Sequence, residues 1–182
     1  MRWQAFSKGI AQNLHPFGQD LLVFLQEDRQ VRILPGYGWM DGGCLVLAAA
    51  LRAWSQGRLG IAAWMRECAQ TDDGLLVDHY AATVLDEDVF LLLDADGLGT
   101  VEDFTAKMDL EQTSGGFLVV DALPYFEQAC IGQRPKIEAN LYPGNPVPTL
   151  VSGLVQAFGD FTMDRIWLGW PERGLDAVVM RP

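Results

Sequence analysis

The stretch HYAATVLDEDVFLLLDADG, residues 79–97, carries the strongest β-strand pattern in this chain of 182 residues. Two apolar runs, 79–84 and 89–93, flank an acidic triplet, and three residues between apolar runs are typical of a β-hairpin. The closing DADG is rich in turn-forming residues. The sequence therefore predicts an antiparallel hairpin in which His79 and Asp94 lie opposite each other near its open end.

The segment before this hairpin has the composition of a loop followed by helices. Residues 35–43 (PGYGWMDGG) contain four glycines, and the good helix formers Leu and Ala follow from Cys44 onward. We expect this helix to end near Gly57, a second short helix over 61–69, and a turn at 71–74.

The remaining elements have weaker patterns, and together with the hairpin they indicate a mixed α+β fold. The apolar run at 20–26 fits a helix and a strand equally. The expected elements are a short amphipathic helix within 1–19 that ends at His15-Pro16, a strand at 31–33, a helix beginning at Thr100, a strand over 117–120, a helix over 123–130, a Pro-rich extended loop over 132–148, and a terminal hairpin of 166–170 with 175–180.

Composition excludes several classes of protein. The chain is 49% hydrophobic and 20% charged, as expected for a globular protein. Its formal charge of −11 argues against a nucleic-acid binder and against docking on an anionic membrane, since both need clustered cations. Three irregularly spaced cysteines argue against a disulfide scaffold, and no apolar run is long enough to span a bilayer. We expect a cytoplasmic protein.

The residues around Cys44 form the strongest candidate site. This cysteine follows the glycine pair Gly42-Gly43 at a predicted helix start, where the helix dipole lowers a thiol pKa and free N–H groups can hold an oxyanion. His79 can take the proton of the thiol, and Asp94 or Asp96 can accept a hydrogen bond from the other ring nitrogen. Strand alternation does not choose between the two aspartates.

This ordered set resembles the papain-like cysteine peptidases in their compact, transglutaminase-related forms, over about residues 37–104. The resemblance implies a nucleophile-bearing helix packed on a small antiparallel sheet, with Cys44 as nucleophile and His79 as general base and acid. It also implies Asp94 or Asp96 as orienting residue, and chemistry on amide or isopeptide bonds through a thioester. Many papain-like enzymes carry a Gln before the nucleophile, whereas residues 37–41 contain none, so a backbone N–H or the Trp39 indole N–H would replace it.

This interpretation divides one domain, 1–182, into three parts. Residues 1–36 form an N-terminal helical and strand segment, 37–121 the catalytic core, and 122–182 a C-terminal extension with the Pro-rich loop and hairpin. We expect Gly42, Gly43 and Trp39 to line the substrate and oxyanion site. We expect no cofactor and no metal; in a calcium-loop alignment of DADGLGTVED the first ligand position would be Leu92.

A different class of function also fits the sequence. Acidic proteins can bind basic partners without any catalysis, and Cys44 would then be an inert buried residue. The acids are scattered in small groups along the chain, a distribution that often serves solubility alone. Under either interpretation the expected partner is a protein or peptide, with basic character favoured by the charge. The sequence does not indicate an oligomeric state.

Overall fold

The structure is a computed structural model that describes residues 21, 23, 25, 26 and 39 and the ranges 43–86, 89–111, 115–130, 147–158 and 179–180. Its centre is an antiparallel sheet of six strands in the order β4-β3-β2-β1-β5-β6. The strands are β1 (Gly60–Glu67), β2 (Leu75–Asp86), β3 (Val89–Asp94), β4 (Gly97–Thr100), β5 (Phe117–Val119) and β6 (Val179–Met180). The expected α+β class is confirmed at this level.

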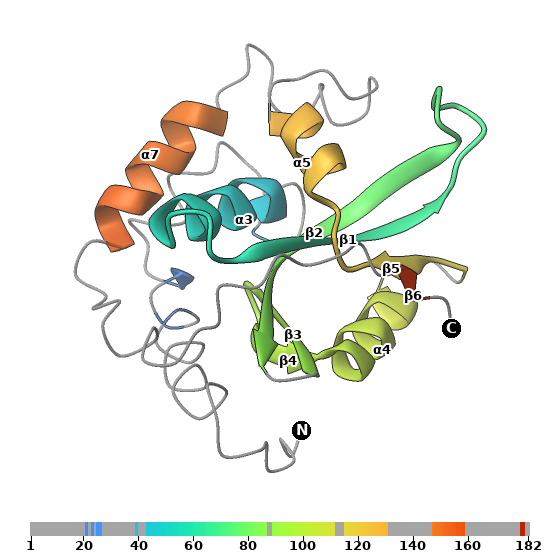
Figure 1. The fold of residues 1–182 in the computed structure, drawn as a ribbon, viewed down its shortest axis with the longest axis horizontal. Coiled ribbons are helices and arrows are strands. Elements are labelled where there is room, and N and C mark those ends of the chain that lie inside the picture. Colours follow the sequence, from blue (N-terminus) through green and yellow to red (C-terminus); the bar gives the residue numbers. More distant parts are fainter. Residues whose placement is uncertain are drawn as a thin grey trace.

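Helices cover both faces of the sheet (Figure 1). Helix α3 (Gly43–Trp54) lies on one face with α5 (Leu123–Cys130) and α7 (Val147–Ala157) packed against it. Helix α4 (Val101–Glu111) connects β4 to β5 and contacts β3 and β4 on the other face. Each face therefore has its own hydrophobic core.

Strand β1 replaces the helix that the sequence predicted over 61–69. Ile61, Ala63 and Met65 belong to the core on the α3 face, whereas Ala62 and Trp64 belong to the core under α4. Because both faces are buried, the apolar run does not alternate with polar residues, and periodicity cannot distinguish such a strand from a helix. Pairing with β2 on one side and β5 on the other outweighs the helix propensity of its alanines.

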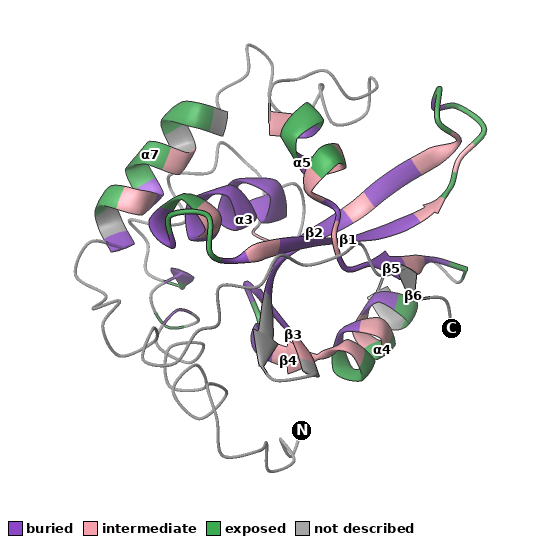
Figure 2. Cartoon of the chain, in the orientation of Figure 1, coloured by how far each residue is buried: buried purple, intermediate pink, exposed green. Residues whose placement is uncertain are grey.

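Helix α3 confirms the helix expected from Cys44, and it is buried along almost its whole length (Figure 2). It ends at Trp54 in a turn where Gln56 and Gly57 have φ angles of 55° and 80°. The Gly57 N–H returns to the carbonyl of Arg52 at 2.8 Å, a common helix C-terminal hydrogen bond. This burial holds the N-terminus of α3, and therefore Cys44, firmly in place.

The β2–β3 hairpin is longer and its turn tighter than the sequence predicted. Asp86 pairs with Val89, so two residues rather than three connect the strands, and β2 begins at Leu75. The expectation that Asp94 lies directly opposite His79 is wrong. Leu93 pairs with Ala82, so Asp94 is displaced from His79 by two residues. Long side chains still meet across such a diagonal.

Helix α4 begins at Val101, with Thr100 as its N-cap as expected. The Thr100 hydroxyl accepts a hydrogen bond from the N–H of Asp103 at 3.1 Å, and the Asp103 carboxylate accepts from the Thr100 N–H at 3.3 Å. This is a capping box with Asp in place of Glu. Strand β4 before it was not predicted, because two of the four residues in its GLGT sequence are glycines, which are depleted in strands.

The C-terminal elements are partly as predicted. Helix α5 and strand β5 confirm the predicted helix 123–130 and strand 117–120. Helix α7 begins inside the expected loop 132–148 and keeps Pro148 in its first turn, where a missing N–H costs nothing. Strand β6 pairs with β5; residues 166–170, its expected partner, lie outside the described residues.

Other expectations for the N-terminal part also fall outside what the structure describes. They are the helix over 1–19, the strand at 31–33, and most of the loop 35–43, including Gly42. Of the ambiguous run 20–26, the described residues Leu21, Val23 and Leu25 are helical.

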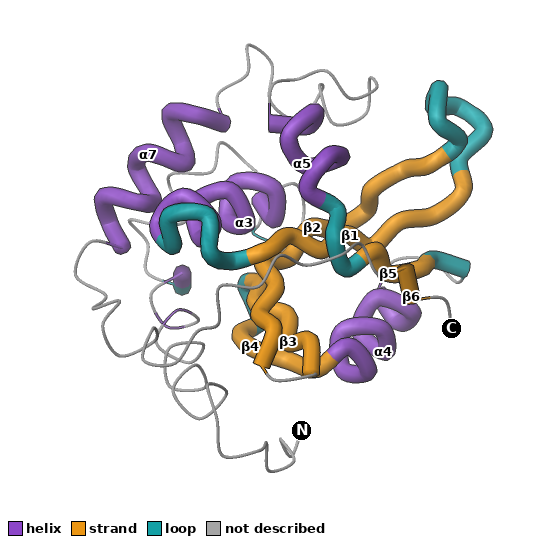
Figure 3. Tube along the Cα trace, in the orientation of Figure 1, coloured by secondary structure: helices purple, strands orange, loops and turns teal. Residues whose placement is uncertain are grey.

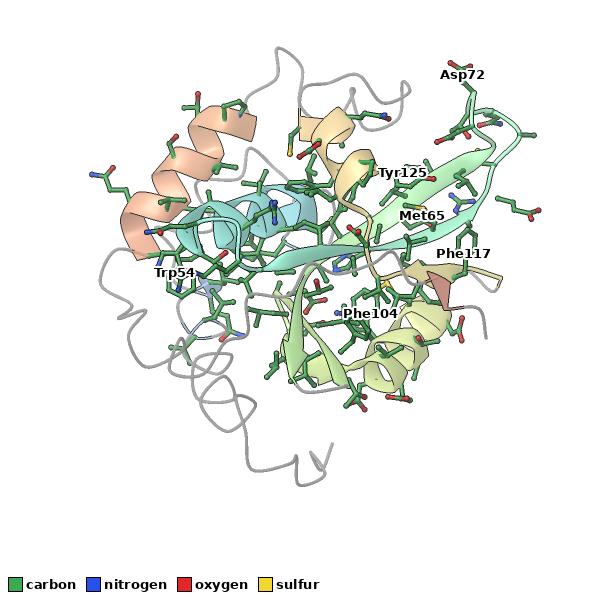
Figure 4. The ribbon with its side chains drawn as sticks, in the orientation of Figure 1. Trp54, Met65, Asp72, Phe104, Phe117 and Tyr125 are labelled. Atoms are coloured by element: carbon green, nitrogen blue, oxygen red, sulfur yellow. The ribbon has the colours of Figure 1, made fainter. Side chains whose placement is uncertain are left out.

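The β1–β2 hairpin extends beyond the rest of the sheet (Figure 3). Its turn is closed by hydrogen bonds from Cys68 N–H to the Gly74 carbonyl and from Gly74 N–H to the Thr71 carbonyl. The tip carries exposed Asp72 and Asp73, and Figure 4 places Asp72 at its far end. The turn predicted at 71–74 is confirmed.

Candidate functional site

Cys44 lies in the first turn of α3, directly after Gly43, and only 6% of its surface is exposed. Burial raises the pKa of its thiol, but the charge and hydrogen bonding of His79 and the backbone N–H groups of Tyr80 and Leu45 outweigh this, and the pKa is lowered overall. The thiol is therefore placed where its anion is stabilised, at the positive end of a helix.

His79 comes from β2 and is completely buried. Its Nε2 is hydrogen-bonded to Oδ2 of Asp94 at 3.0 Å, and its ring packs at 5.6 Å from the ring of Phe104. Burial lowers the pKa of the imidazole, but the Cys44 thiolate and the Asp94 carboxylate outweigh burial and raise it to about 9.

The second ring nitrogen of His79 is the one left for Cys44. Nδ1 is buried and makes no hydrogen bond of ordinary geometry to any described residue. Cys44 and His79 nevertheless act on each other: His79 lowers the pKa of the thiol, and Cys44 raises the pKa of the imidazole. Catalytic hydrogen bonds are often long or poorly aligned before substrate binds, so this geometry fits a thiol–imidazole pair that shares one proton.

Asp94, at the end of β3, is 5% exposed and accepts three hydrogen bonds. Oδ2 accepts from Nε2 of His79 and, at 2.7 Å, from Nζ of Lys107; Oδ1 accepts from the N–H of Asp96 at 2.8 Å. Burial raises the pKa of this carboxyl, but His79 and Lys107 together lower it to about 2. Asp94 is therefore an anion at every physiological pH.

The geometry distinguishes the two aspartates that the sequence left open. Asp94 contacts His79, whereas the Asp96 side chain is 55% exposed and its carboxylate pairs with Nζ of Lys107 at 2.7 Å. The strand ends at Asp94 and the chain turns, so the two carboxylates do not share a strand face.

The residues expected to line the substrate site are only partly brought to it. Gly43 opens α3 beside Cys44, and Gly42 lies outside the described residues. The indole N–H of Trp39 donates to the carbonyl of Leu25 at 3.0 Å, so it is already engaged. The backbone N–H groups at the start of α3 are the remaining donors for an oxyanion.

Lys107 is the site residue that sequence reasoning missed. Its ammonium lies between Asp94 and Asp96, and their charges raise its pKa against the opposing effect of burial. The sequence feature that could have identified it is that Lys107 is the one basic residue in α4, the helix that follows the two aspartates.

These residues provide a nucleophile, a proton carrier and a fixed anion, the parts needed for covalent acyl transfer.

Among the described residues, no three His, Cys, Asp or Glu side chains come together in a way that could hold a metal ion. Within the same residues, no helix has the length and apolar character to cross a membrane. Comparison of the chain with protein-family models, curated proteins and solved structures gave no significant match.

Proposed function

We propose that this protein is a thiol-dependent hydrolase or acyltransferase that acts on an amide or isopeptide bond through Cys44, His79 and Asp94. The observation that carries the proposal is that Cys44 and His79 are both buried, with His79 hydrogen-bonded to Asp94 at 3.0 Å. Their interaction lowers the thiol pKa and raises the imidazole pKa to about 9. A lowered thiol pKa beside a raised imidazole pKa favours the thiolate–imidazolium form, which is the resting state of an activated cysteine nucleophile.

The first chemical step forms a thioester. The Cys44 sulfur attacks the carbonyl carbon, and the carbonyl oxygen takes the electron pair of the C=O double bond. When the tetrahedral intermediate collapses, the C–N bond breaks and the imidazolium of His79 gives its proton to the leaving nitrogen. Asp94, hydrogen-bonded to Nε2 at 3.0 Å, holds the ring and leaves Nδ1 as the nitrogen available to the sulfur.

The oxyanion of the intermediate needs hydrogen-bond donors beside Cys44. The first turn of α3 offers backbone N–H groups without intrahelical acceptors, and the helix dipole adds positive potential there. These groups substitute for the glutamine that is missing before the nucleophile, since the Trp39 indole is bonded to Leu25.

The second step releases the acyl group. Neutral His79 takes a proton from water or from an amine, the incoming oxygen or nitrogen bonds to the acyl carbon, and the C–S bond breaks to restore the thiolate. Water gives hydrolysis and an amine gives acyl transfer.

The arrangement of these residues also supports a papain-like architecture as part of the proposal. In chain order, the nucleophile opens a buried helix, the histidine lies on a long strand, and the acid ends the neighbouring antiparallel strand. This is the order that the resemblance implies.

Trapping of the acyl intermediate tests the function. The protein is incubated with p-nitrophenyl acetate, a small activated acyl donor, and its intact and peptide masses are measured. We expect acetyl-Cys44 to accumulate in the wild type, and release of p-nitrophenol to stop in Cys44→Ala and to slow at least about 100-fold in His79→Gln.

A matched control uses the other two cysteines, Cys68 and Cys130, which are partly buried, whereas Cys44 is buried. The double variant Cys68→Ser/Cys130→Ser should keep full activity. Equal acetylation of all three cysteines, or turnover that survives Cys44→Ala, would contradict the proposal and favour the non-catalytic binding protein.

A further inference from the structure

Lys107 and His79 bind the same oxygen atom. Nζ of Lys107 lies 2.7 Å from Oδ2 of Asp94, and Nε2 of His79 lies 3.0 Å from it. The lysine side chain is only 18% exposed, its ammonium is 2.7 Å from Oδ2 of Asp96, and it lies 5.7 Å from the centre of the Phe104 ring. Helix α4 thus places a second cation beside the carboxylate that supports the imidazole.

The orientation of Asp94 does not depend on this lysine alone. Oδ1 is held by the N–H of Asp96 at 2.8 Å, and Oδ2 is held by His79. Two contacts from different directions fix a planar carboxylate, so the separate contribution of Lys107 is its charge. That charge reaches the imidazolium across one shared oxygen, in an environment from which most water is excluded.

We propose that Lys107 is a positioning residue that sets how firmly His79 holds its proton, by sharing Oδ2 of Asp94 with the imidazole. The proposal deepens the function proposed above and rests on it. His79 interacts with two anionic groups, the Cys44 thiolate and Asp94. Both stabilise the imidazolium, which makes it a weaker acid toward the leaving group. The ammonium of Lys107 repels the imidazolium and so offsets part of this stabilisation.

Each element packed around His79 contributes a defined charge, or none. Helix α3 contributes Cys44, β3 contributes Asp94, and α4 contributes Lys107 with the uncharged Phe104. Strand β1 places uncharged Trp64 opposite His79. Among the described groups that face His79, Lys107 is therefore the one cation, and its removal changes the net charge around the imidazole in a known direction.

Titration of His79 by NMR tests this directly. The chain has two histidines, so the imidazole signals are assigned with a His15→Gln variant. Two unit charges about 6 Å apart at an effective dielectric constant of about 20 shift a pKa by roughly two units, and partial exposure of the ammonium reduces this to about one. We expect the pKa of His79 to rise by about one unit in Lys107→Met and to return in Lys107→Arg.

Further variants separate charge from hydrogen bonding and from folding. Lys107→Gln keeps a donor for Asp94 without the charge, so the pKa of His79 should rise as in Lys107→Met. Asp96→Asn removes the exposed partner of Lys107 and should change the pKa of His79 by less than about 0.3 units. Near-ultraviolet circular dichroism identifies the variants that keep their tertiary structure.

An unchanged or lowered His79 pKa in folded Lys107→Met or Lys107→Gln would overturn the proposal, as would an equal shift in Asp96→Asn. Because the titration reads the imidazole without any substrate, it remains informative if Cys44 proves not to be acylated. Failure of acylation counts against the proposed function, and failure of the titration counts against the role of Lys107. The pH profile of p-nitrophenol release should move to higher pH with His79 in the same variants.

Discussion

Replacement of Asp94 by Asn removes one negative charge from the centre of the site with little change of shape. In the wild type, Oδ1 of Asp94 accepts a hydrogen bond from the Asp96 N–H at 2.8 Å, and the amide oxygen of the variant can still accept it. It cannot give His79 and Lys107 the anionic oxygen that both now share. Two charge-assisted hydrogen bonds are therefore weakened in a buried location, and the cations lose their counter-ion.

The magnitude follows from the pKa of Asp94. Folding lowers it from an ordinary 3.8 to about 2, so the folded state stabilises the carboxylate. A shift of nearly two units corresponds to about 2 kcal/mol of stability at neutral pH. Because the folded pKa is the lower one, this stability is fully present above about pH 4 and is lost as the pH falls through about 2.

Urea unfolding of both proteins between about pH 7 and pH 3 measures this difference. The free energy of unfolding of Asp94→Asn should be lower by about 2 kcal/mol above pH 4, and the two curves should approach each other as the pH falls further. Asp96→Asn is the matched control, and because that carboxylate is exposed it should cost less than about 0.5 kcal/mol.

Three outcomes would refute the reasoning. If Asp94→Asn matches the wild type at pH 7, the carboxylate carries no net stabilisation. If its deficit stays constant down to the lowest pH, the loss reflects packing rather than the ionised form. An equal cost in Asp96→Asn would show that surface charge alone accounts for the effect.

Further predictions concern the scaffold of the site. A methyl group at Gly116 would overlap the indole of fully buried Trp64, so Gly116→Ala should lower the free energy of unfolding by about 1–3 kcal/mol. Gly153 in α7 has no atoms near such a methyl group, so Gly153→Ala should instead raise the free energy of unfolding by up to about 1 kcal/mol; destabilisation there would contradict the assigned helix. Thr100→Ala removes the acceptor for the Asp103 N–H and should cost about 1 kcal/mol in urea unfolding, with recovery in Thr100→Ser; a neutral Thr100→Ala would argue against the cap.

The elements that sequence predicted well are those with strong local signals. The β2–β3 hairpin follows from two apolar runs around acidic turn residues, and α3 from helix formers after glycines. Helix α4 follows from the Thr100 cap and the acids of its first turn. Local chemistry and tertiary structure agree at these positions, so no long-range information is needed.

The elements that sequence missed depend on distant partners. Strand β1 has the composition of a helix, and only its position between β2 and β5 makes it a strand. Helix α7 begins among prolines, yet it is held by packing of Leu154 and Phe158 in the core with α3. Neither partner lies within reach of a short sequence window.

The candidate site divides in the same way. Cys44, His79 and Asp94 were named from residue type and order, because their chemistry has local markers such as a helix start and a strand end. The choice of Asp94 over Asp96 needed the point where β3 ends, and Lys107 needed the packing of α4 on β3 and β4. The engagement of Trp39 with Leu25 joins segments 14 residues apart and has no local marker.

The central claim is that Cys44 is a thiolate at neutral pH because His79 holds a proton beside it. The ultraviolet absorbance of thiolate, measured against pH as the difference between wild type and Cys44→Ser, tests this without requiring access of any reagent to the buried sulfur. We predict that the Cys44 thiolate is already present at pH 7, and that in a His79→Ala background the same step moves to about pH 9 or above. A wild-type step at the ordinary thiol pKa, unchanged by His79→Ala, would contradict the account.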